Sequence, residues 1–250
     1  SGMTWFTDMF GWVFGGIAWA LDWPILWMQW ILHALPWAVT IFLFCIISYI
    51  ASGKSLAIFT LLASFYMVAV GYWDESMNSL SLVAISVPMA VIIGFLVGVL
   101  GFYSHRAERV IMPTLDIFQT VPTFAYLLPI LLLFGFGTTV GLIASLLYSF
   151  PPMVRNTIVG LRSVPSEIIE SGLMSGATPR QLFWQVRVPT ALRQILLGIN
   201  QATMASLSMV IIASIIGGTA DIGWEVLSTM RKALFGQSVS AGIVIALIAM

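Results

Sequence analysis

Apolar runs of about twenty residues, separated by short polar stretches, fill most of the sequence. A run of this length crosses the hydrocarbon core of a membrane as a helix, which satisfies its own backbone hydrogen bonds. The composition fits this class, since 60% of the 250 residues are hydrophobic and 8% are charged. We therefore predict an all-α integral membrane fold with about seven transmembrane helices. They are expected over about residues 31–52, 55–73, 79–103, 113–134, 139–155 and 194–216, and from residue 238 onward.

The first stretch of the chain carries a stripe of tryptophans. Seven lie between residues 5 and 37, and at about 100° per residue they fall within roughly 40° of one line along a helix. Because indole rings favour the membrane interface, residues 1–30 are predicted to form a periplasmic, interfacial amphipathic segment. Its helix is expected over residues 3–23, with breaks at Pro24 and Pro36. An aromatic cage for a cation is the alternative, but a cage needs rings that converge on a point.

Basic residues gather in one set of the loops between the predicted spans. Eight of the ten fall on one side, which makes that side cytoplasmic and places the N-terminus outside. The eight are Lys54, Arg106, Arg109, Arg155, Arg162, Arg180, Arg187 and Arg193. Four acidic residues fall on the other side, namely Asp74, Glu75, Asp221 and Glu225. Residues 31–250 thus form a transmembrane domain with one long cytoplasmic loop at 156–190.

That loop has the pattern of two short helices joined by a sharp turn. The first ends at Gly176, which tolerates the left-handed conformation that reverses the chain. Thr178 and Gln181 form a capping-box pattern that starts the second helix. This second helix is expected to end near Pro189, because the residue before a proline is pushed out of the helical region. The sequence predicts a compact projection from the membrane domain.

A polar, proline-containing stretch within the predicted span 113–134 is a candidate for part of a translocation path. Pro122 and Pro129 do not suit a continuous helix, and broken helices at membrane depth are tolerated where they line a cavity or pack on protein. A proline-kinked helix that only packs is the alternative. The candidate path residues are Gln119, Thr120, Pro122, Phe124 and Tyr126.

A second polar stretch lies in the predicted span 194–216. Asn200, Thr203 and Ser206 share one side of a helix and are expected to face a pore or the bundle interior. Hydrogen bonding between helices explains them equally well. In the third predicted span, Gly94 and Gly98 have the spacing that allows two helices to approach closely.

The sequence contains no motif for catalysis, for a metal or for a bound cofactor. It lacks a Walker A loop, a dinucleotide fingerprint and a zinc motif. Cys45 is the single cysteine, which excludes disulfides and cysteine-based metal sites within the chain. His33 and His105 lie far apart in the sequence, so an intramembrane hydrolase has weak support. The net charge is zero and gives no indication of a nucleic-acid partner.

The polar loop resembles the cytoplasmic loop signature of ABC importer permeases. That signature begins with a glutamate and two small residues, which are followed by a glycine. It ends with two aliphatic residues, separated by one residue, and a proline. The spacing here is the same, with Ser171 and Gly172 where alanines are usual. By this resemblance, the residues that couple to an ATPase are Glu170, Ser171, Gly172, Gly176, Ala177, Thr178 and Pro189.

Residues 119–217 are also similar to the permease subunit of quaternary-amine importers, which take up glycine betaine, proline betaine, choline, carnitine and related osmolytes. The motifs that carry this likeness are Gln119-Thr120-x-Pro122, Pro151-Pro152 with Arg155, and Gly198-Ile199-Asn200-Gln201. The resemblance implies a binding-protein-dependent type I ABC importer permease fold in a bacterial inner membrane. It also implies a small quaternary amine or an amine N-oxide as the substrate.

The same resemblance implies the partners. Two copies would form the pore, and each loop would dock on one of two ATP-binding cassette subunits. ATP and Mg²⁺ would be used by those subunits, so this chain would bind no cofactor and would not be an enzyme. An extracytoplasmic binding protein would deliver the substrate, lipid would surround the helices, and no nucleic acid would be involved. An ATP-independent channel or secondary transporter for a small polar solute is the alternative, and it gives the polar loop no task.

Overall fold

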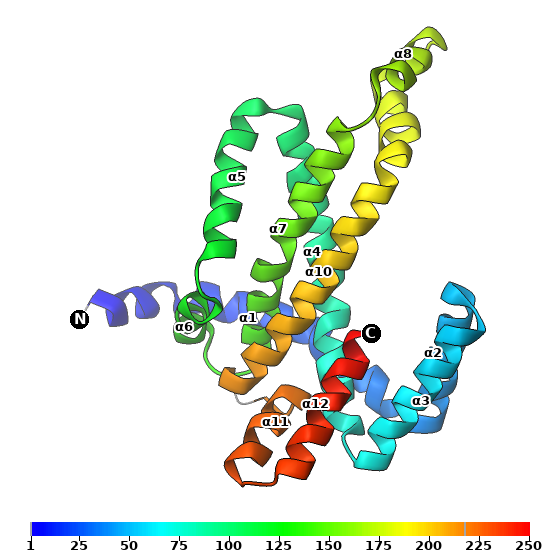
Figure 1. The fold of residues 1–250 in the computed structure, drawn as a ribbon. Coiled ribbons are helices and arrows are strands. Elements are labelled where there is room, and N and C mark those ends of the chain that lie inside the picture. The colour runs from blue at the N-terminus through cyan, green and yellow to red at the C-terminus, as the bar shows by residue number, and fades with distance from the viewer. Residues whose placement is uncertain (1, 218) are drawn as a thin grey trace. The chain divides into compact units, whose positions relative to one another are not determined.

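The computed structural model describes the backbone of residues 2–217 and 219–250, and their side chains except at 2–11, 13 and 126. These described residues form helices and short connections and no strand, which confirms the all-α class. Figure 1 shows α1 (Gly2–Ala34), α2 (Trp37–Ser52), α3 (Lys54–Val70), α4 (Trp73–Tyr103), α5 (His105–Thr120), α6 (Thr123–Phe134), α7 (Thr138–Arg162), α8 (Ser166–Met174), α9 (Pro179–Gln181), the π-helical segment η1 (Leu182–Arg187), α10 (Val188–Gly217), α11 (Ile222–Arg231) and α12 (Phe235–Ala249).

The predicted number of spans is not confirmed. By length and composition, two described helices are able to cross a membrane, namely α4 and the continuous helix Pro179–Gly217. The number rises to as many as four if the bent pairs α1–α2 and α5–α6 each count as one span. Two shorter apolar helices, α3 and α12, have fewer than 18 residues. The coarser prediction of several apolar helices holds, whereas the figure of about seven stays a prediction.

Prolines set several boundaries differently from the prediction. Pro24 does not break α1, which runs through it to Ala34, so this helix tolerates both the lost hydrogen bond and the clash of the proline ring. Pro36 does break the chain, and α1 from Phe14 onward meets α2 at 106°. The span expected over residues 31–52 is therefore divided between two helices.

The chain is divided into two compact units. Unit 1 comprises residues 1–86, 124–145 and 207–250, and unit 2 comprises residues 87–123 and 146–206. In unit 1, α2 and α3 form a hairpin at Gly53, and α11 and α12 form a second hairpin (Figure 1). Helix α11 was not predicted, because it is short and contains charged residues between two apolar runs.

Hydroxyl and amide groups connect the helices of unit 1. Asp22 of α1 accepts hydrogen bonds from the hydroxyls of Thr138 and Thr139 at the start of α7. His33 Nε2 lies 2.9 Å from Asn78 Oδ1, and the Asn78 amide donates to a carbonyl of the segment before α11. The tryptophans of α1 whose side chains are described are exposed. A lipid-facing role for residues 1–30 stays a prediction.

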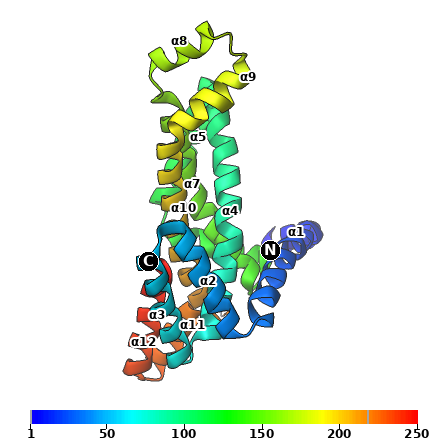
Figure 2. The same ribbon diagram turned by 90° about the vertical axis from the view of Figure 1, so that its right-hand side faces the viewer.

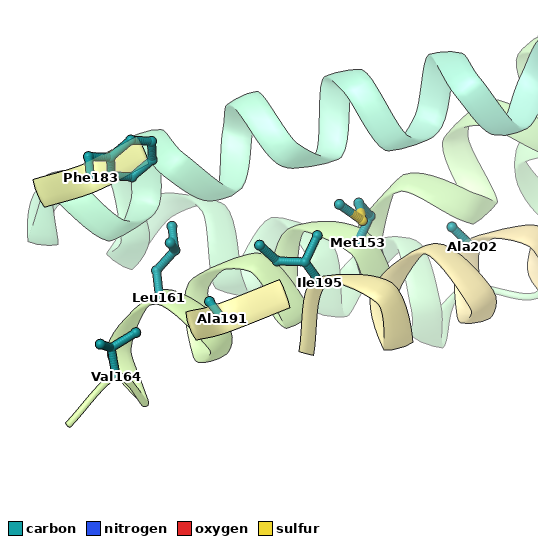
Figure 3. Packing of buried hydrophobic residues seen from close by; sticks show 7 residues of the cluster. All are labelled: Met153, Leu161, Val164, Phe183, Ala191, Ile195 and Ala202. Carbon is teal, nitrogen blue, oxygen red and sulfur yellow. The ribbon is translucent and has the colours of Figure 1, made fainter. Parts of the chain in front are cut away.

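Unit 2 is built on close packing between α4 and α7. A Cβ added to Gly94 would lie 2.7 Å from Met153 Cβ, and one added to Gly98 would lie 2.6 Å from Thr157 Cβ. The predicted close approach at these two glycines is thereby confirmed. Figure 3 shows the adjoining core, in which buried side chains come from α7, the connection after it, η1 and α10. Its labelled members are Met153, Leu161, Val164, Phe183, Ala191, Ile195 and Ala202.

Candidate functional site

The predicted polar projection is present in unit 2, and we call residues 166–187 the knob. Figure 2 shows its helices α8 and α9 joined by a short turn beyond the adjoining ends of α7 and α10. Gly176 has φ 77° and reverses the chain after α8. Its N–H donates to Leu173 O at 2.9 Å, and the N–H of Ala177 donates to Gly172 O at 3.1 Å. This pair of bonds is the Schellman arrangement, which satisfies the terminal carbonyls of a helix.

The second half of the knob begins with the predicted capping box. Gln181 N–H donates to Thr178 Oγ1, and the Gln181 side chain reaches back to the backbone N–H of Thr178 at 2.9 Å. Pro179 occupies the first helical position, where a missing N–H has no cost. The turn of the knob is thus fixed from both sides by local hydrogen bonds.

The prediction that this second helix ends near Pro189 is wrong. Helix α9 passes through η1 into α10 without a break. Within η1 the backbone takes wider π-helical turns, and the Val188 N–H donates to Phe183 O, five residues earlier. Because Pro189 has no N–H to offer, this local widening accommodates its ring and lets the helix continue. The knob is therefore a direct extension of α10.

Small residues allow α8 to lie against η1. A Cβ added to Gly172 would lie 2.9 Å from Leu182 Cδ1 and 3.4 Å from Val186 Cγ2. Phe183 is buried and contacts the ring of Trp184 edge-on at 5.1 Å between centroids. An alanine at position 172 needs only a small shift of a flexible leucine, whereas a larger side chain would push α8 away from η1. This explains why a small residue is needed at position 172.

The outer face of the knob presents apolar side chains to its surroundings. Met174 is 90% exposed and Leu173 is 55% exposed at the tip, and Ile168 is 40% exposed on α8. Glu170, Ser171 and Gly176 of the signature are also exposed. Apolar side chains exposed on a polar projection are typical of surfaces that contact another protein.

Ion pairs tie the base of the knob to α5. The Arg162 guanidinium donates to both oxygens of Glu108, at 2.5 and 2.6 Å. His105 Nδ1 lies 3.1 Å from the same carboxylate. The Arg162 hydrogen bond, with a smaller contribution from His105, holds the pKa of Glu108 below its usual value. These groups belong to the polar segment 104–109 and to the start of the predicted loop 156–190, outside the predicted spans. Arg155 pairs with Asp116 in the same unit.

The structure places the first set of path candidates at a helix break. Helix α5 ends at Thr120, Val121 is extended with ψ 130°, and α6 begins at Thr123, which confirms the predicted break before Pro122. Pro129 lies inside α6 and does not break it. The side chains of Gln119, Thr120, Pro122 and Phe124 are exposed, and that of Tyr126 lies outside the described residues. Their role in a path stays a prediction.

The second set of path candidates does not lie on one buried face of α10, because the three residues differ in exposure. Asn200 is exposed, Thr203 is half-buried and donates to the carbonyl of Ile199, and Ser206 is buried. A different polar group joins α7 to α10. Asn156 Nδ2 donates to Gln201 Oε1 at 2.8 Å, and Gln194 Nε2 donates to Asn156 Oδ1 at 2.7 Å. We call Asn156, Gln194 and Gln201 the amide cluster.

The amide cluster was not predicted from the sequence as a unit. Asn156 is 8% exposed, and its amide also donates to Pro152 O at 2.8 Å. The available signal was a row of polar and small residues at 194, 198 and 201, which lie on one side of a helix. The matching asparagine sits just beyond the expected end of the fifth span, which was placed at residue 155, whereas α7 continues to Arg162.

Comparison with known proteins identifies the class of this membrane protein. Residues 90–250 match the family described as the binding-protein-dependent transport system inner membrane component, and the chain belongs to this family. Its fold resembles that of a chain in the crystal structure of an amino acid ABC transporter, with a TM-score of 0.58 and 21% identity. This match covers 74% of the present chain and 90% of the other.

Among curated proteins, the chain is similar to permease proteins of three transport systems. It is 34% identical to the glycine betaine/proline betaine permease ProW of Escherichia coli, over 100% of this chain and 70% of ProW. It is 35% identical to the glycine betaine permease OpuAB of Bacillus subtilis, over 98% of this chain and 86% of OpuAB. It is 38% identical to the trimethylamine N-oxide permease TmoV of Pelagibacter ubique, over 87% of this chain but only 30% of TmoV. The resemblance to quaternary-amine permeases is confirmed.

Proposed function

We propose that this chain is the transmembrane permease subunit of an ATP-driven importer for a small quaternary amine or a related osmolyte. Glycine betaine, choline, carnitine and amine N-oxides are the substrate class. The observation that carries the proposal is the knob, which is rigid by its own hydrogen bonds and exposes apolar side chains. The relatives, which are permease proteins of glycine betaine and trimethylamine N-oxide transport systems, support the choice of substrate class.

The proposed assembly contains two copies of this chain, which form the pore, and two ATP-binding cassette subunits. Each knob docks on one of these subunits, where ATP and Mg²⁺ are used, so this chain is not an enzyme and binds no cofactor. An extracytoplasmic binding protein delivers the substrate. The protein lies in a bacterial inner membrane with its N-terminus outside, residues 1–30 at the outer interface and the loop 156–190 in the cytoplasm. The alternative remains an ATP-independent channel or secondary transporter.

The test uses the turn of the knob in the complete importer. Gly176→Val places a β-branched residue at φ 77°, a conformation that such residues rarely adopt. We expect the variant to lose the co-purifying ATPase and to lose ATP-dependent uptake of radiolabelled betaine in proteoliposomes by roughly tenfold or more.

Gly135→Val is a matched control. Gly135 also has φ 77°, and a Cβ there meets no atom within 4 Å, as at Gly176. The control suffers the same backbone strain in a connection outside the knob, so it should retain its ATPase. Uptake that continues without ATP in the wild type would favour the channel or secondary transporter. Equal loss of the ATPase in both variants would contradict the proposal that the knob docks on the ATPase.

A further inference from the structure

The amide cluster lies within a reciprocal contact between α7 and α10. A Cβ added to Gly198 of α10 would lie 2.8 Å from Asn156 Cβ, and one added to Gly160 of α7 would lie 3.0 Å from Gln194 Cβ. Each helix therefore places an amide side chain over a glycine of the other. The two amides also bond each other directly at 2.7 Å.

This arrangement fits only one register of the two antiparallel helices. Asn156 uses its oxygen for Gln194 and its nitrogen for Gln201 and for the carbonyl of Pro152. A slide by one helical turn, about 5.4 Å, would separate these groups and drive the amide side chains against positions that have a Cβ. Because a buried amide without partners is costly, the register is strongly fixed.

The cluster lies in the two helices that flank the knob. The knob connects the end of α7 to the start of α10. Arg187 of η1 donates a hydrogen bond to Leu161 O of α7 at 3.4 Å. The same guanidinium lies 5.1 Å from the centre of the Phe102 ring of α4. A force on the knob thus reaches α7 and α10 together, at a place where they are held in register.

We propose that Asn156 is a positioning residue that makes α7 and α10 move as one rigid stem when the knob is displaced. The inference rests on the proposed function, since the displacement would come from an ATPase. Asn156 therefore does more than stabilise the fold. With the cluster, movement of the knob becomes a rigid-body movement of two helices. Without it, the helices slip past each other and ATP hydrolysis proceeds without transport.

The first test removes the hydrogen bonds but keeps the packing. In the triple variant Asn156→Leu, Gln194→Met and Gln201→Met, each new side chain has a shape close to the old one. Replacing the three amides together leaves no amide of the cluster without its side-chain partner, so the protein should fold and melt near the wild type. We expect ATP hydrolysis by the reconstituted importer to stay within about twofold, while betaine taken up per ATP falls roughly tenfold.

The outcomes separate this inference from the proposed function. Wild-type uptake that does not depend on ATP would contradict the proposed function. ATP-driven wild-type uptake, together with an unchanged ratio of uptake to hydrolysis in a stable triple variant, would contradict the positioning role alone.

A second test covers the case in which the triple variant does not fold. The pair Gly160→Cys and Gln194→Cys, made with Cys45→Ser, places two Cβ atoms about 3.0 Å apart, a small shift from the separation of roughly 3.5–4.5 Å in a disulfide. Reduced, this protein lacks Gln194 and should couple poorly. Oxidised, it should regain most of its uptake per ATP, because the disulfide fixes the register. The single variant Gln194→Cys should not respond to the oxidant. If cross-linking abolishes uptake, the helices must move past each other and the inference is wrong.

Discussion

Unit 2 contains seven of the ten basic residues and four of the ten acidic ones, whereas unit 1 contains three basic and six acidic residues. The seven are Arg106, Arg109, Arg155, Arg162, Arg180, Arg187 and Arg193. Two carboxylates of unit 2 are paired with guanidinium groups, at Glu108 and Asp116. In unit 1, Asp22 and Asp221 accept hydrogen bonds from threonine hydroxyls.

These two ways of holding a carboxylate have opposite consequences. A guanidinium supplies a compensating charge and geometry suited to both carboxylate oxygens. A hydroxyl supplies one neutral donor, so the cost of desolvating the charge is only partly offset. Accordingly the pKa of Glu108 is lowered by Arg162, whereas burial raises the pKa of Asp221 above its usual value. Glycines bring helices into close contact in both units, at Gly94 and Gly98 in unit 2 and at Gly223 in unit 1, where an added Cβ would collide with Ser214 Oγ.

The largest effect is expected from filling a tight helix contact in unit 2, compared with an open position in unit 1. Gly98→Ala in α4 adds a Cβ 2.6 Å from Thr157 Cβ, and because neither atom is at the end of a flexible chain, the helices must separate. We expect a loss of about 1–3 kcal/mol in unfolding free energy. Gly242→Ala in α12 of unit 1 meets no atom within 4 Å and should be neutral or stabilising by up to about 1 kcal/mol. Thermal unfolding in detergent measures both, and equal effects would refute the packing contrast.

A smaller effect is expected from removing the guanidinium at the base of the knob. Arg162→Gln leaves the Glu108 carboxylate without its main partner and should lower the melting temperature at pH 7. Because the pKa of Glu108 is lowered in the folded state, its contribution is present above the unfolded pKa and is lost as the pH falls through the folded value. The difference between variant and wild type should therefore shrink on acidification. A difference independent of pH would mean that Arg162 acts through packing alone.

The sequence was a good guide wherever the controlling interaction is local. The turn at Gly176 and the capping box of Thr178 involve residues three to five apart, and both were predicted correctly. The apolar runs likewise predicted helices, because burial in lipid or protein requires satisfied backbone groups. The glycine spacing at 94 and 98 pointed to a close contact without naming its partner.

Features that depend on a distant partner were harder to predict. Pro189 reads as a helix end, yet the π-helical turn before it lets the helix continue. Asn200 was expected on an inward face, yet it is exposed. Gln201 beside it is also exposed, and it is Gln201 that accepts a hydrogen bond from Asn156 in another helix. Side chains one position apart on a helix point about 100° apart, so the periodicity cannot choose between them without the neighbouring helix.

The smallest effect is expected from neutralising Asp221, the buried carboxylate of unit 1 that accepts a hydrogen bond from a hydroxyl. Asp221 is 1% exposed and accepts a hydrogen bond from Thr219 at 2.5 Å. Because burial raises its pKa in the folded state, folding is favoured below the unfolded pKa and loses that contribution as the pH rises through the folded value. Asp221→Asn keeps an acceptor for Thr219 and removes the charge. It also removes a favourable interaction with the N-terminus of α11, worth about 0.3–1 kcal/mol, which keeps the gain small. The variant should melt slightly higher than the wild type at pH 8 and equally at pH 4. A lower melting temperature at pH 8 would show that the interaction of the charge with the N-terminus of α11 outweighs the cost of desolvating it. The carboxylate of Asp221 would then stabilise the fold, as that of Glu108 does.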